Sequence, residues 1–277
     1  MTESTEHPLG VQHLAGCVAL SKSANWNQNE ADWRLMLELG RGWGVSLDDG
    51  TLAASTLVLP YEGFAWISMV LVLPEHRRMG YASRLLRVAI NDLESRALTP
   101  ALDATPAGRE VYQHEGFIDA WAFSRLALTG KGQGEEDHDE VRPLRESDWA
   151  WILELDSAAF GASRERLLRA LARRLPQAAL VVEGRGFLLG RDGRQANQLG
   201  PLVASDEQTA RLLLSRALSK VQPPVYLDVV GHAPQLREWL EARSFWFQRP
   251  YTRMVRGERR APGDENLVYL VAGPELG

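Results

Sequence analysis

The chain has 277 residues, of which 45% are hydrophobic and 24% charged, a composition typical of soluble globular proteins. This length suffices for two domains, each with its own core. The formal net charge of −5 argues against a nucleic-acid partner, because neutralising phosphates requires a basic surface. The single cysteine, Cys17, excludes an intrachain disulfide framework and a cysteine-rich zinc site.

The first residues, MTESTEHPLG, do not combine a basic region with an apolar core. No segment approaches the roughly 18 consecutive apolar residues that a membrane-spanning helix needs. We therefore expect neither an export signal nor a membrane partner, and a cytoplasmic location.

The chain is predicted to begin with a strand at residues 11–15, followed by a helix. Asn29 is a suitable N-cap for the next helix, and Gly40 a suitable end. Between these helices, residues 25–28 (Asn-Trp-Asn-Gln) form a turn in which Trp26 packs for stability. Asp49-Gly50 then predicts a type I′ turn between strands at residues 43–47 and 51–59.

Residues 64–98 are the central stretch of the first half. Residues 64–73 are almost continuously apolar and rich in Val, Ile and aromatics, which is typical of a strand covered on both faces. Pro74 ends this strand. The helix that follows Gly80 is predicted to bury one face, formed by Ala82, Leu85, Leu86, Ala89, Ile90, Leu93 and Ala97.

The turn at residues 77–82, Arg-Arg-Met-Gly-Tyr-Ala, is suited to binding an anion. Unpaired N–H groups and the positive end of the helix dipole attract phosphate at a helix start. Gly80 and the small residue Ala82 allow the ligand to approach the backbone closely.

The pattern Val-x-Pro-x-x-Arg-x-x-Gly-x-Ala, from Val72 to Ala82, resembles the acetyl-CoA site of the GNAT superfamily of N-acetyltransferases. Residues 107–117, Ala-Gly-Arg-Glu-Val-Tyr-Gln-His-Glu-Gly-Phe, resemble its second signature. The resemblance implies an α/β (α+β) fold, with a mixed central sheet flanked by helices. It also implies an acyltransferase that passes an acetyl group from acetyl-CoA, without a metal, to a primary amine of a small molecule or peptide.

The resemblance also implies roles for individual residues. Tyr112 would be the general acid that protonates the departing thiolate; otherwise it is a half-buried tyrosine that packs under the loop. Thr105 stands where many GNAT proteins carry an Asn that contacts the cofactor. The resemblance also implies that residues 25–28 lie beside the acceptor pocket, as the alternative to a purely structural turn. The residues implied in acetyl-CoA binding are Val70, Leu71, Val72, Arg77, Arg78, Met79, Gly80, Tyr81, Ala82, Ser83 and Thr105.

The general base is left open, because the central strand carries no carboxylate at residues 66–69. Glu62, Asp103 or a carboxylate from the second half could act through water. His114 and His76 are bases by residue type, but their positions suggest structural or surface roles.

The second half repeats the first in outline. Asp192-Gly193 matches Asp49-Gly50, and Leu227-Asp228 matches Leu102-Asp103. Ser205 and Gln208 form a capping-box pattern before a helix with a buried face at Ala210, Leu213, Leu214 and Ala217. The segment before that helix lacks Arg-x-x-Gly-x-Ala and carries Asp206 and Glu207, and Leu240 stands where the first half has Tyr112. A degenerate copy without a CoA site is predicted.

The domain organisation follows. The first GNAT domain is predicted at residues 1–128, with residues 121–128 as its last strand. Residues 129–140, glycine-rich and then acidic, form a linker in preference to a metal or nucleotide site. The second domain spans residues 141–277. The alternative to an enzyme is a protein that binds or senses acyl-CoA without turnover.

Overall fold

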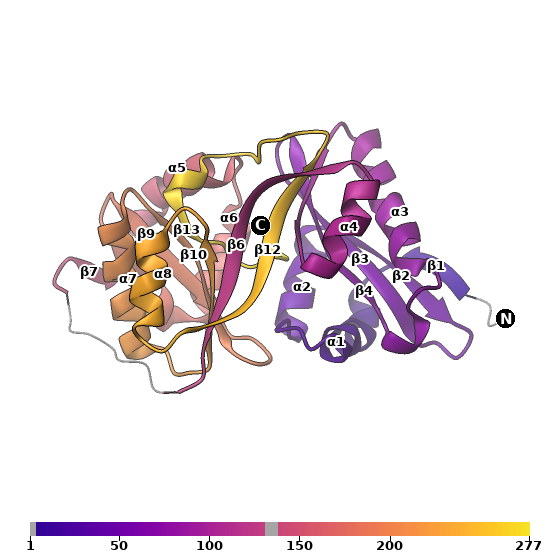
Figure 1. Cartoon of the computed structure of the whole chain (residues 1–277), viewed down its shortest axis with the longest axis horizontal. Coiled ribbons are helices and arrows are strands. Elements are labelled where there is room, and N and C mark those ends of the chain that lie inside the picture. The colour runs from indigo at the N-terminus through magenta and orange to yellow at the C-terminus, as the bar shows by residue number, and fades with distance from the viewer. Residues whose placement is uncertain (1–3, 131–137) are drawn as a thin grey trace.

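The computed structural model describes residues 4–130 and 138–277. Figure 1 shows two lobes joined by two long strands, β6 (Phe117–Leu128) and β12 (Trp246–Arg256). Within the described residues, one 13-stranded mixed sheet has the order β1-β2-β3-β4-β5-β12-β6-β11-β13-β10-β9-β8-β7. The predicted fold class, a mixed sheet flanked by helices, is confirmed.

The first lobe places helices on both faces of its part of the sheet. Its strands are β1 (Ser4–Pro8), β2 (Arg41–Leu47), β3 (Leu52–Pro60), β4 (Phe64–Val72) and β5 (Thr99–Ala104), and its helices are α1 (Leu14–Ser23), α2 (Glu30–Leu39), α3 (Tyr81–Ser95) and α4 (Pro106–His114). Neighbouring residues of β3 face opposite layers: Leu57 shares a core with α1 and α2, and Val58 shares one with α3. Both faces of the central strands are therefore buried, as their apolar sequence predicts.

The amphipathic pattern after Gly80 forms α3. Leu85, Leu86, Ala89, Ile90 and Leu93 are all buried, whereas Ala82 is half-buried and Ala97 lies beyond the end of the helix and is exposed. In α2, the predicted N-cap Asn29 accepts a hydrogen bond from the Asp32 N–H, and the helix ends before Gly40. Local sequence signals therefore determine these helix boundaries.

Two local predictions are wrong. Residues 11–15 form the short 3-10 helix η1 (Val11–His13) and the start of α1, while the first strand is β1. The sequence of β1 is polar because it pairs only with β2, at the edge of the sheet. The β2–β3 turn is not type I′, because Gly50 (φ +84°) has a positive φ and Asp49 does not.

The second lobe repeats this plan. Its strands are β7 (Val141–Pro143), β8 (Leu180–Val182), β9 (Gly186–Arg191), β10 (Asn197–Ala204), β11 (Val225–Val230) and β13 (Val268–Leu270), and its helices are α5 (Trp149–Phe160), α6 (Glu165–Arg174), α7 (Glu207–Lys220) and α8 (Pro234–Glu241). The predicted buried face of α7 is confirmed, since Ala210, Leu213, Leu214 and Ala217 are buried. Its N-cap is Asp206 rather than Ser205.

The two halves exchange strands where they meet. The segment predicted as the last strand of the first domain lies in β6, which pairs with β11 and β12 of the second half. In return, β12 pairs with β5 of the first half. Residues 131–137 of the predicted linker lie outside the described residues.

Two buried ion pairs fasten the exchanged strands. Arg125 on β6 donates to Asp228 on β11, with N–O distances of 2.8 and 2.7 Å. Arg253 on β12 donates to Asp103 on β5, with both distances 3.0 Å. Each arginine thus pairs with the aspartate of the other half, and such two-point pairs fix the strand register.

Candidate active site between the lobes

An opening in the sheet lies beside β4. Strands β4 and β5 pair in parallel only from Phe64↔Thr99 to Trp66↔Ala101, and beyond that point the described residues provide no partner for β4 on this side. Met69 has a φ of +52°, and the register of β4 against β3 shifts there. The backbone at residues 70–72 therefore borders a gap as wide as a missing strand.

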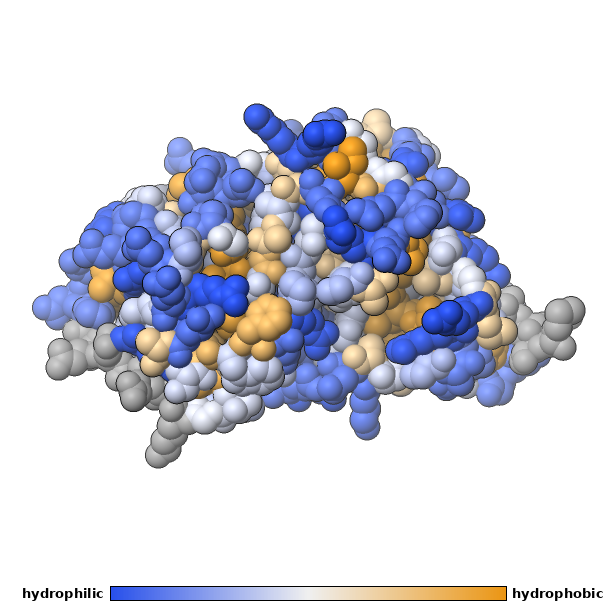
Figure 2. Space-filling view, in the orientation of Figure 1, coloured by the Kyte–Doolittle hydropathy of each residue, from blue (hydrophilic) through white to orange (hydrophobic). Residues whose placement is uncertain are grey.

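A groove of about 650 Å³ occupies this gap. Among the residues that line it are six of those implied by the resemblance: Val70, Leu71, Val72, Arg77, Ala82 and Thr105. Tyr112 lines it as well. Viewed as in Figure 1, most of this face is hydrophilic, and apolar residues are exposed in a hollow of the right-hand lobe and in a patch left of centre (Figure 2).

The loop at the start of α3 forms one end of the groove. Arg78 and Gly80 have positive φ angles of 62° and 83°, and α3 begins without a side-chain cap. A Cβ added to Gly80 would have no atom within 4 Å, so the space beside its backbone is open. The Arg77 Nε donates to the Val72 carbonyl over 3.5 Å, which ties this loop to β4.

Other predicted residues of this loop do not turn their side chains to the groove. Tyr81 is buried against Val45, Ala53 and Ala54, and the Met79 side chain is 58% exposed. Arg78, Met79, Gly80, Tyr81 and Ser83 are absent from the groove lining, so the loop borders the groove through Arg77 and Ala82. Of these residues, the backbone N–H groups at the start of α3 are suited to binding an anion, and the side chains are not placed to do so.

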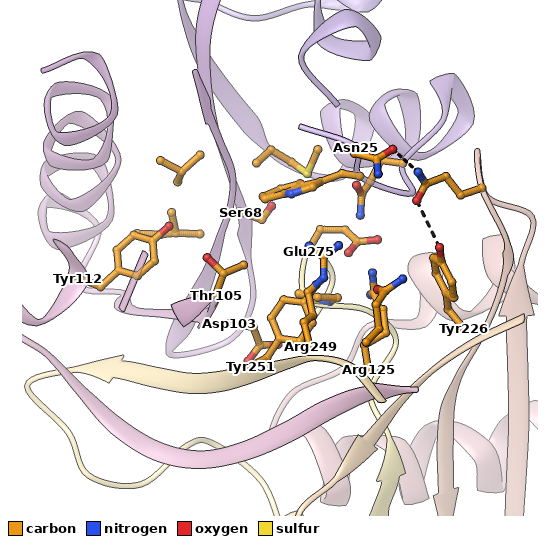
Figure 3. A pocket seen from close by; sticks show the side chains of 18 residues that line it. Asn25, Ser68, Asp103, Thr105, Tyr112, Arg125, Tyr226, Arg249, Tyr251 and Glu275 are labelled. Atoms are coloured by element: carbon orange, nitrogen blue, oxygen red, sulfur yellow. Dashed lines mark hydrogen bonds between the residues drawn. The ribbon is translucent and has the colours of Figure 1, made fainter. Parts of the chain in front are cut away.

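Thr105 and Tyr112 belong to α4 and its cap. The Thr105 hydroxyl accepts a hydrogen bond from the Gly108 N–H over 3.3 Å. The Tyr112 ring packs against Phe117, and its hydroxyl points into the cavity without a hydrogen-bond partner among the described residues (Figure 3). Desolvation raises the pKa of Tyr112 to about 12, so the hydroxyl stays protonated at neutral pH.

A second cavity continues from the groove into the junction of the lobes. It shares Trp26, Val70, Asp103, Thr105, Tyr112 and Arg249 with the groove. Its other lining residues come from both halves and include Asn25, Gln28, Ser68, Arg125, Gln195, Tyr226, Gln248, Tyr251, Pro274 and Glu275 (Figure 3). Sequence reasoning missed Arg125, Tyr226, Arg249 and Glu275 as site residues. Arg125 follows Phe117, and Arg253 follows Phe245, by the same eight residues, and this repeat was a signal in the sequence for Arg125.

Residues 25–28 form a structural turn and also line the cavities, so both alternatives that the sequence left open hold. The Asn27 side chain donates to the Ala196 carbonyl and accepts from the N–H groups of Gln195 and Ala196, with distances of 2.8–3.0 Å. It thereby ties α1–α2 to the β9–β10 loop of the second half. Trp26 lines both cavities, and Asn25 and Gln28 line the second.

Several buried polar atoms of this second cavity lack a partner. They are Gln28 Oε1, Ser68 Oγ, Gln248 Oε1 and Glu275 Oε2. Leaving such an atom unsatisfied costs about 1–3 kcal/mol. A ligand that donates hydrogen bonds here would remove that cost.

The three carboxylates proposed as bases occupy different environments. Glu62 is exposed in the turn before β4, at the end of that strand away from the groove. Both oxygens of Asp103 accept from Arg253, and burial raises its pKa to about 6. Glu275 supplies the carboxylate from the second half: it lines the second cavity, Arg191 donates to its Oε1, and its Oε2 is free.

The last residues of the sequence hold Glu275 in place. The Trp66 Nε1 donates to the Pro274 carbonyl over 3.0 Å, and the Tyr61 hydroxyl donates to the Leu276 carbonyl over 3.3 Å. Arg164 donates to the Gly277 carbonyl over 2.6 Å. Neither His114, which is exposed on α4, nor His76 lines either cavity.

The equivalent opening in the second half is filled by the chain itself. Strands β10 and β11 pair in parallel from Asn197↔Val225 to Leu199↔Leu227, and β13 then lies between them, with Leu270 opposite both Leu202 and Val229. Gly200 allows this approach, because a Cβ there would collide with the Val271 carbonyl.

The start of α7 is closed as well. The Asp206 carboxylate accepts from the Thr209 N–H over 2.8 Å, and its hydrogen bonds lower its pKa to about 2. It thus occupies, with its own negative charge, the position at which a helix N-terminus binds a ligand anion. Leu240, at the position of Tyr112, is buried in α8.

Within the described part of the chain, no helix is long and apolar enough to cross a membrane. The same residues contain no group of three or more His, Cys, Asp or Glu side chains that could hold a metal. Cys17 is buried, and desolvation raises its pKa to about 12, which is typical of an unreactive thiol.

Comparisons with known proteins agree with this division into halves. A model described as "Acetyltransferase (GNAT) family" matches residues 13–117, and one described as "Acetyltransferase (GNAT) domain" matches residues 152–270. An uncharacterised N-acetyltransferase of Bacillus subtilis, YitH, is 23% identical over 96% of both chains.

Solved structures share the fold over nearly the full length. A putative acetyltransferase from Pyrococcus horikoshii has a TM-score of 0.85 and 20% identity, with 99% of this chain and 96% of that chain covered. A tandem GNAT protein from the clavulanic acid biosynthesis pathway has a TM-score of 0.63 and 14% identity, with coverage of 91% and 98%.

Proposed function

Because this chain belongs to the GNAT superfamily as a tandem N-acetyltransferase, we propose that its first half transfers an acetyl group from acetyl-CoA to a primary amine. The observation that carries this proposal is the gap between β4 and β5, which ends at the uncapped start of α3. The corresponding gap in the second half is filled by β13 and its helix start is capped by Asp206.

The groove fits the donor in size and chemistry. The backbone of residues 70–72 offers unpaired strand groups to the amides of the pantetheine arm. The open space at Gly80 and the amides of residues 78–83 suit the diphosphate, with Arg77 adding positive charge. Thr105 borders the same groove from α4.

Acetyl-CoA supplies the acetyl group as a thioester. A backbone N–H of residues 70–72 donates to the thioester carbonyl oxygen and stabilises the charge that develops there. The acceptor nitrogen, once deprotonated, forms the new C–N bond as the C–S bond breaks. Tyr112 donates its proton to the thiolate sulfur.

Glu275 is the base that we assign to this reaction. Its free Oε2 takes a proton from the ammonium form of the acceptor, directly or through water. The ammonium loses two protons in all: one balances the proton given to the thiolate, and one is released. The products are an N-acetyl amide, the CoA thiol and one proton.

The domain organisation is part of the proposal. We propose residues 1–128 as the acetyl-CoA-binding domain, residues 129–140 as a linker and residues 141–277 as a degenerate copy without a CoA site. The second copy then contributes one wall of the acceptor cavity, with Arg249, Tyr226 and Glu275. Strand exchange supports this role, because β12 belongs to the sheet of the first lobe.

Two measurements on the full chain test the activity. Calorimetry should give one acetyl-CoA site per chain, and a panel of primary amines should release the CoA thiol with formation of an N-acetylated product. Binding of acetyl-CoA without thiol release from any amine would favour a non-catalytic acyl-CoA-binding protein. Absence of acetyl-CoA binding would contradict both.

Glu275→Gln tests the base. It should lower kcat by about 10²–10⁴-fold and leave the acetyl-CoA Kd unchanged, because Glu275 does not line the donor groove. The substitution also removes one ion-pair partner of the buried Arg191, so thermal unfolding is measured first to establish that the variant is folded. Glu62→Gln is the matched control, since Glu62 is exposed away from the cavity. Equal kcat in wild type and Glu275→Gln would remove Glu275 from this role.

A further inference from the structure

The charges around the second cavity are balanced except at one residue. Arg125 lines the cavity and pairs with Asp228. The lining carboxylates Asp103 and Glu275 pair with Arg253 and Arg191, and Arg191 also pairs with Asp32. Arg249 forms no ion pair with any carboxylate among the described residues. One positive charge of the cavity is therefore left for a ligand.

The position of Arg249 places that charge beside the reacting groups. It lies on β12, half-buried, and lines both the groove and the second cavity. Figure 3 shows its guanidinium directed toward the centre of the cavity, where Glu275 enters from the opposite side. A ligand atom on Arg249 thus lies near the donor as well as near Glu275.

Glu275 and the other unpartnered polar atoms favour a ligand group that is a cation and a hydrogen-bond donor, whereas Arg249 favours an anion. Gln28 Oε1, Ser68 Oγ and Glu275 Oε2 can accept hydrogen bonds, and all are buried. A primary ammonium group supplies three N–H donors to such a set. The cavity therefore offers a cation-binding side and an anion-binding side.

We propose that the acceptor is a small zwitterion, an amino acid with its amine directed to Glu275 and its carboxylate bound by Arg249. This inference rests on the proposed function and names the substrate class of the same site. Arg249 presents two parallel N–H donors, the geometry that matches a carboxylate. Because Arg249 borders the donor groove, few atoms separate the carboxylate from the reacting nitrogen.

The substrate step balances without a further reactant. Arg249 holds the carboxylate ionised throughout, so the carboxylate exchanges no proton. The amine loses one proton to Glu275, attacks the thioester carbon, and loses a second proton as the amide forms. Arg249 thus binds and orients the acceptor, and the bond changes occur at nitrogen, carbon and sulfur.

The test compares amino acids with the amines that result from removing their carboxylate, such as alanine with ethylamine. A series from α- to ε-amino acids adds the spacing of the two groups, and aminophosphonates replace carboxylate by phosphonate. Thiol release gives kcat/KM, and thermal stabilisation in the presence of CoA reports acceptor binding without turnover. Wild type should show a higher kcat/KM for amino acids whose amine and carboxylate are closely spaced than for the matched amines or the aminophosphonates.

Three variants test whether Arg249 causes the preference for amino acids. Arg249→Gln should lower kcat/KM for the preferred amino acid by about 100-fold and abolish its advantage over the matched amine, with the acetyl-CoA Kd unchanged. Arg249→Lys should retain part of the preference, since it keeps the charge but not the two-point geometry. Arg166→Gln, at an exposed residue of α6, is the control and should match wild type.

The outcomes separate this inference from the acetyltransferase activity. Equal turnover of amino acids and matched amines, unaffected by Arg249→Gln, would overturn the zwitterion and leave the activity standing. Preference for phosphonates, or loss of acetyl-CoA binding in Arg249→Gln, would overturn it as well. Amino acids that stabilise wild type but not Arg249→Gln, without thiol release, would support the site and contradict the activity. Neither stabilisation nor turnover by any amino acid would overturn it.

Discussion

Replacing Gly80 by glutamate tests the donor site at the point where the backbone is most open. Gly80 has a φ of +83°, and a Cβ there would meet no atom within 4 Å. The loss of folding stability is then limited to the backbone strain of a side chain at positive φ, about 1–2 kcal/mol. Steric clashes add no further loss of folding stability, because the space beside Gly80 is open.

The effect on binding is larger. A carboxylate about 6 Å from one diphosphate charge repels it by about 3 kcal/mol at an effective dielectric constant of about 20. Because each 1.4 kcal/mol or so is tenfold, the acetyl-CoA Kd should rise by about 100-fold. The increase should be smaller at high salt, since the loop is exposed.

Gly63→Glu is a matched control. Gly63 has a φ of +79°, no atom within 4 Å of its Cβ position, and a place in the turn before β4, away from the groove. Thermal unfolding of both variants should give similar losses of Tm, and calorimetry should show an acetyl-CoA Kd raised by about 100-fold only in Gly80→Glu. Unchanged binding in Gly80→Glu, or equal loss in both variants, would refute the assignment of the diphosphate site.

Three further predictions concern the acid and the exchanged strands. Tyr112→Phe should lower kcat by about 100-fold or less with acetyl-CoA binding intact, and an unchanged kcat would exclude Tyr112 as the acid. Since the pKa of Tyr112 is about 12, the kcat of wild type should show no loss from this group up to pH 10. Asp228→Asn leaves the buried Arg125 without its ion-pair partner and should lower the free energy of unfolding, measured in urea, by about 3–5 kcal/mol. The double variant Arg125→Met with Asp228→Leu should lose less. A loss in the double variant equal to the sum of the losses in the two single variants would contradict the pairing. Burial raises the pKa of Asp103 from 3.8 to about 6, because the desolvation of its carboxylate outweighs the attraction of Arg253. The neutral form of Asp103 therefore favours the folded state, and this stability is present below pH 4 and lost as the pH rises through 6. The unfolding free energy of wild type relative to Asp103→Asn should fall across that window, and a pH-independent difference would contradict it.

The sequence by itself determined the parts that depend on neighbouring residues. The α3 face, the Asn29 cap and the apolar β4 follow from periodicity and capping, because these act within a few residues. The loop at Gly80 and the position of Tyr112 on α4 were predicted for the same reason, and the groove lining includes Arg77, Ala82 and Tyr112. The polar strand β1 was missed, because an edge strand is held by backbone pairing that leaves no apolar pattern.

Tertiary structure alone decided how the halves combine. The sequence predicts a strand at residues 121–128, within β6, but neither its pairing partners nor the strand β12, since backbone hydrogen bonds carry no sequence information. The repeated spacing of Arg125 and Arg253 was visible, yet only the folded sheet pairs each with the aspartate of the other half.

The acceptor cavity depends most on these long-range contacts. Glu275 reaches it because β13 fills the gap of the second half and the following residues are hydrogen-bonded to Trp66 and Tyr61. Its free carboxylate oxygen and the unpaired Arg249 become significant only once neighbouring charges are seen to be paired. Pairing of buried charges is a property of residues brought together by folding, so the sequence determined the donor loop and the tertiary structure determined the acceptor site.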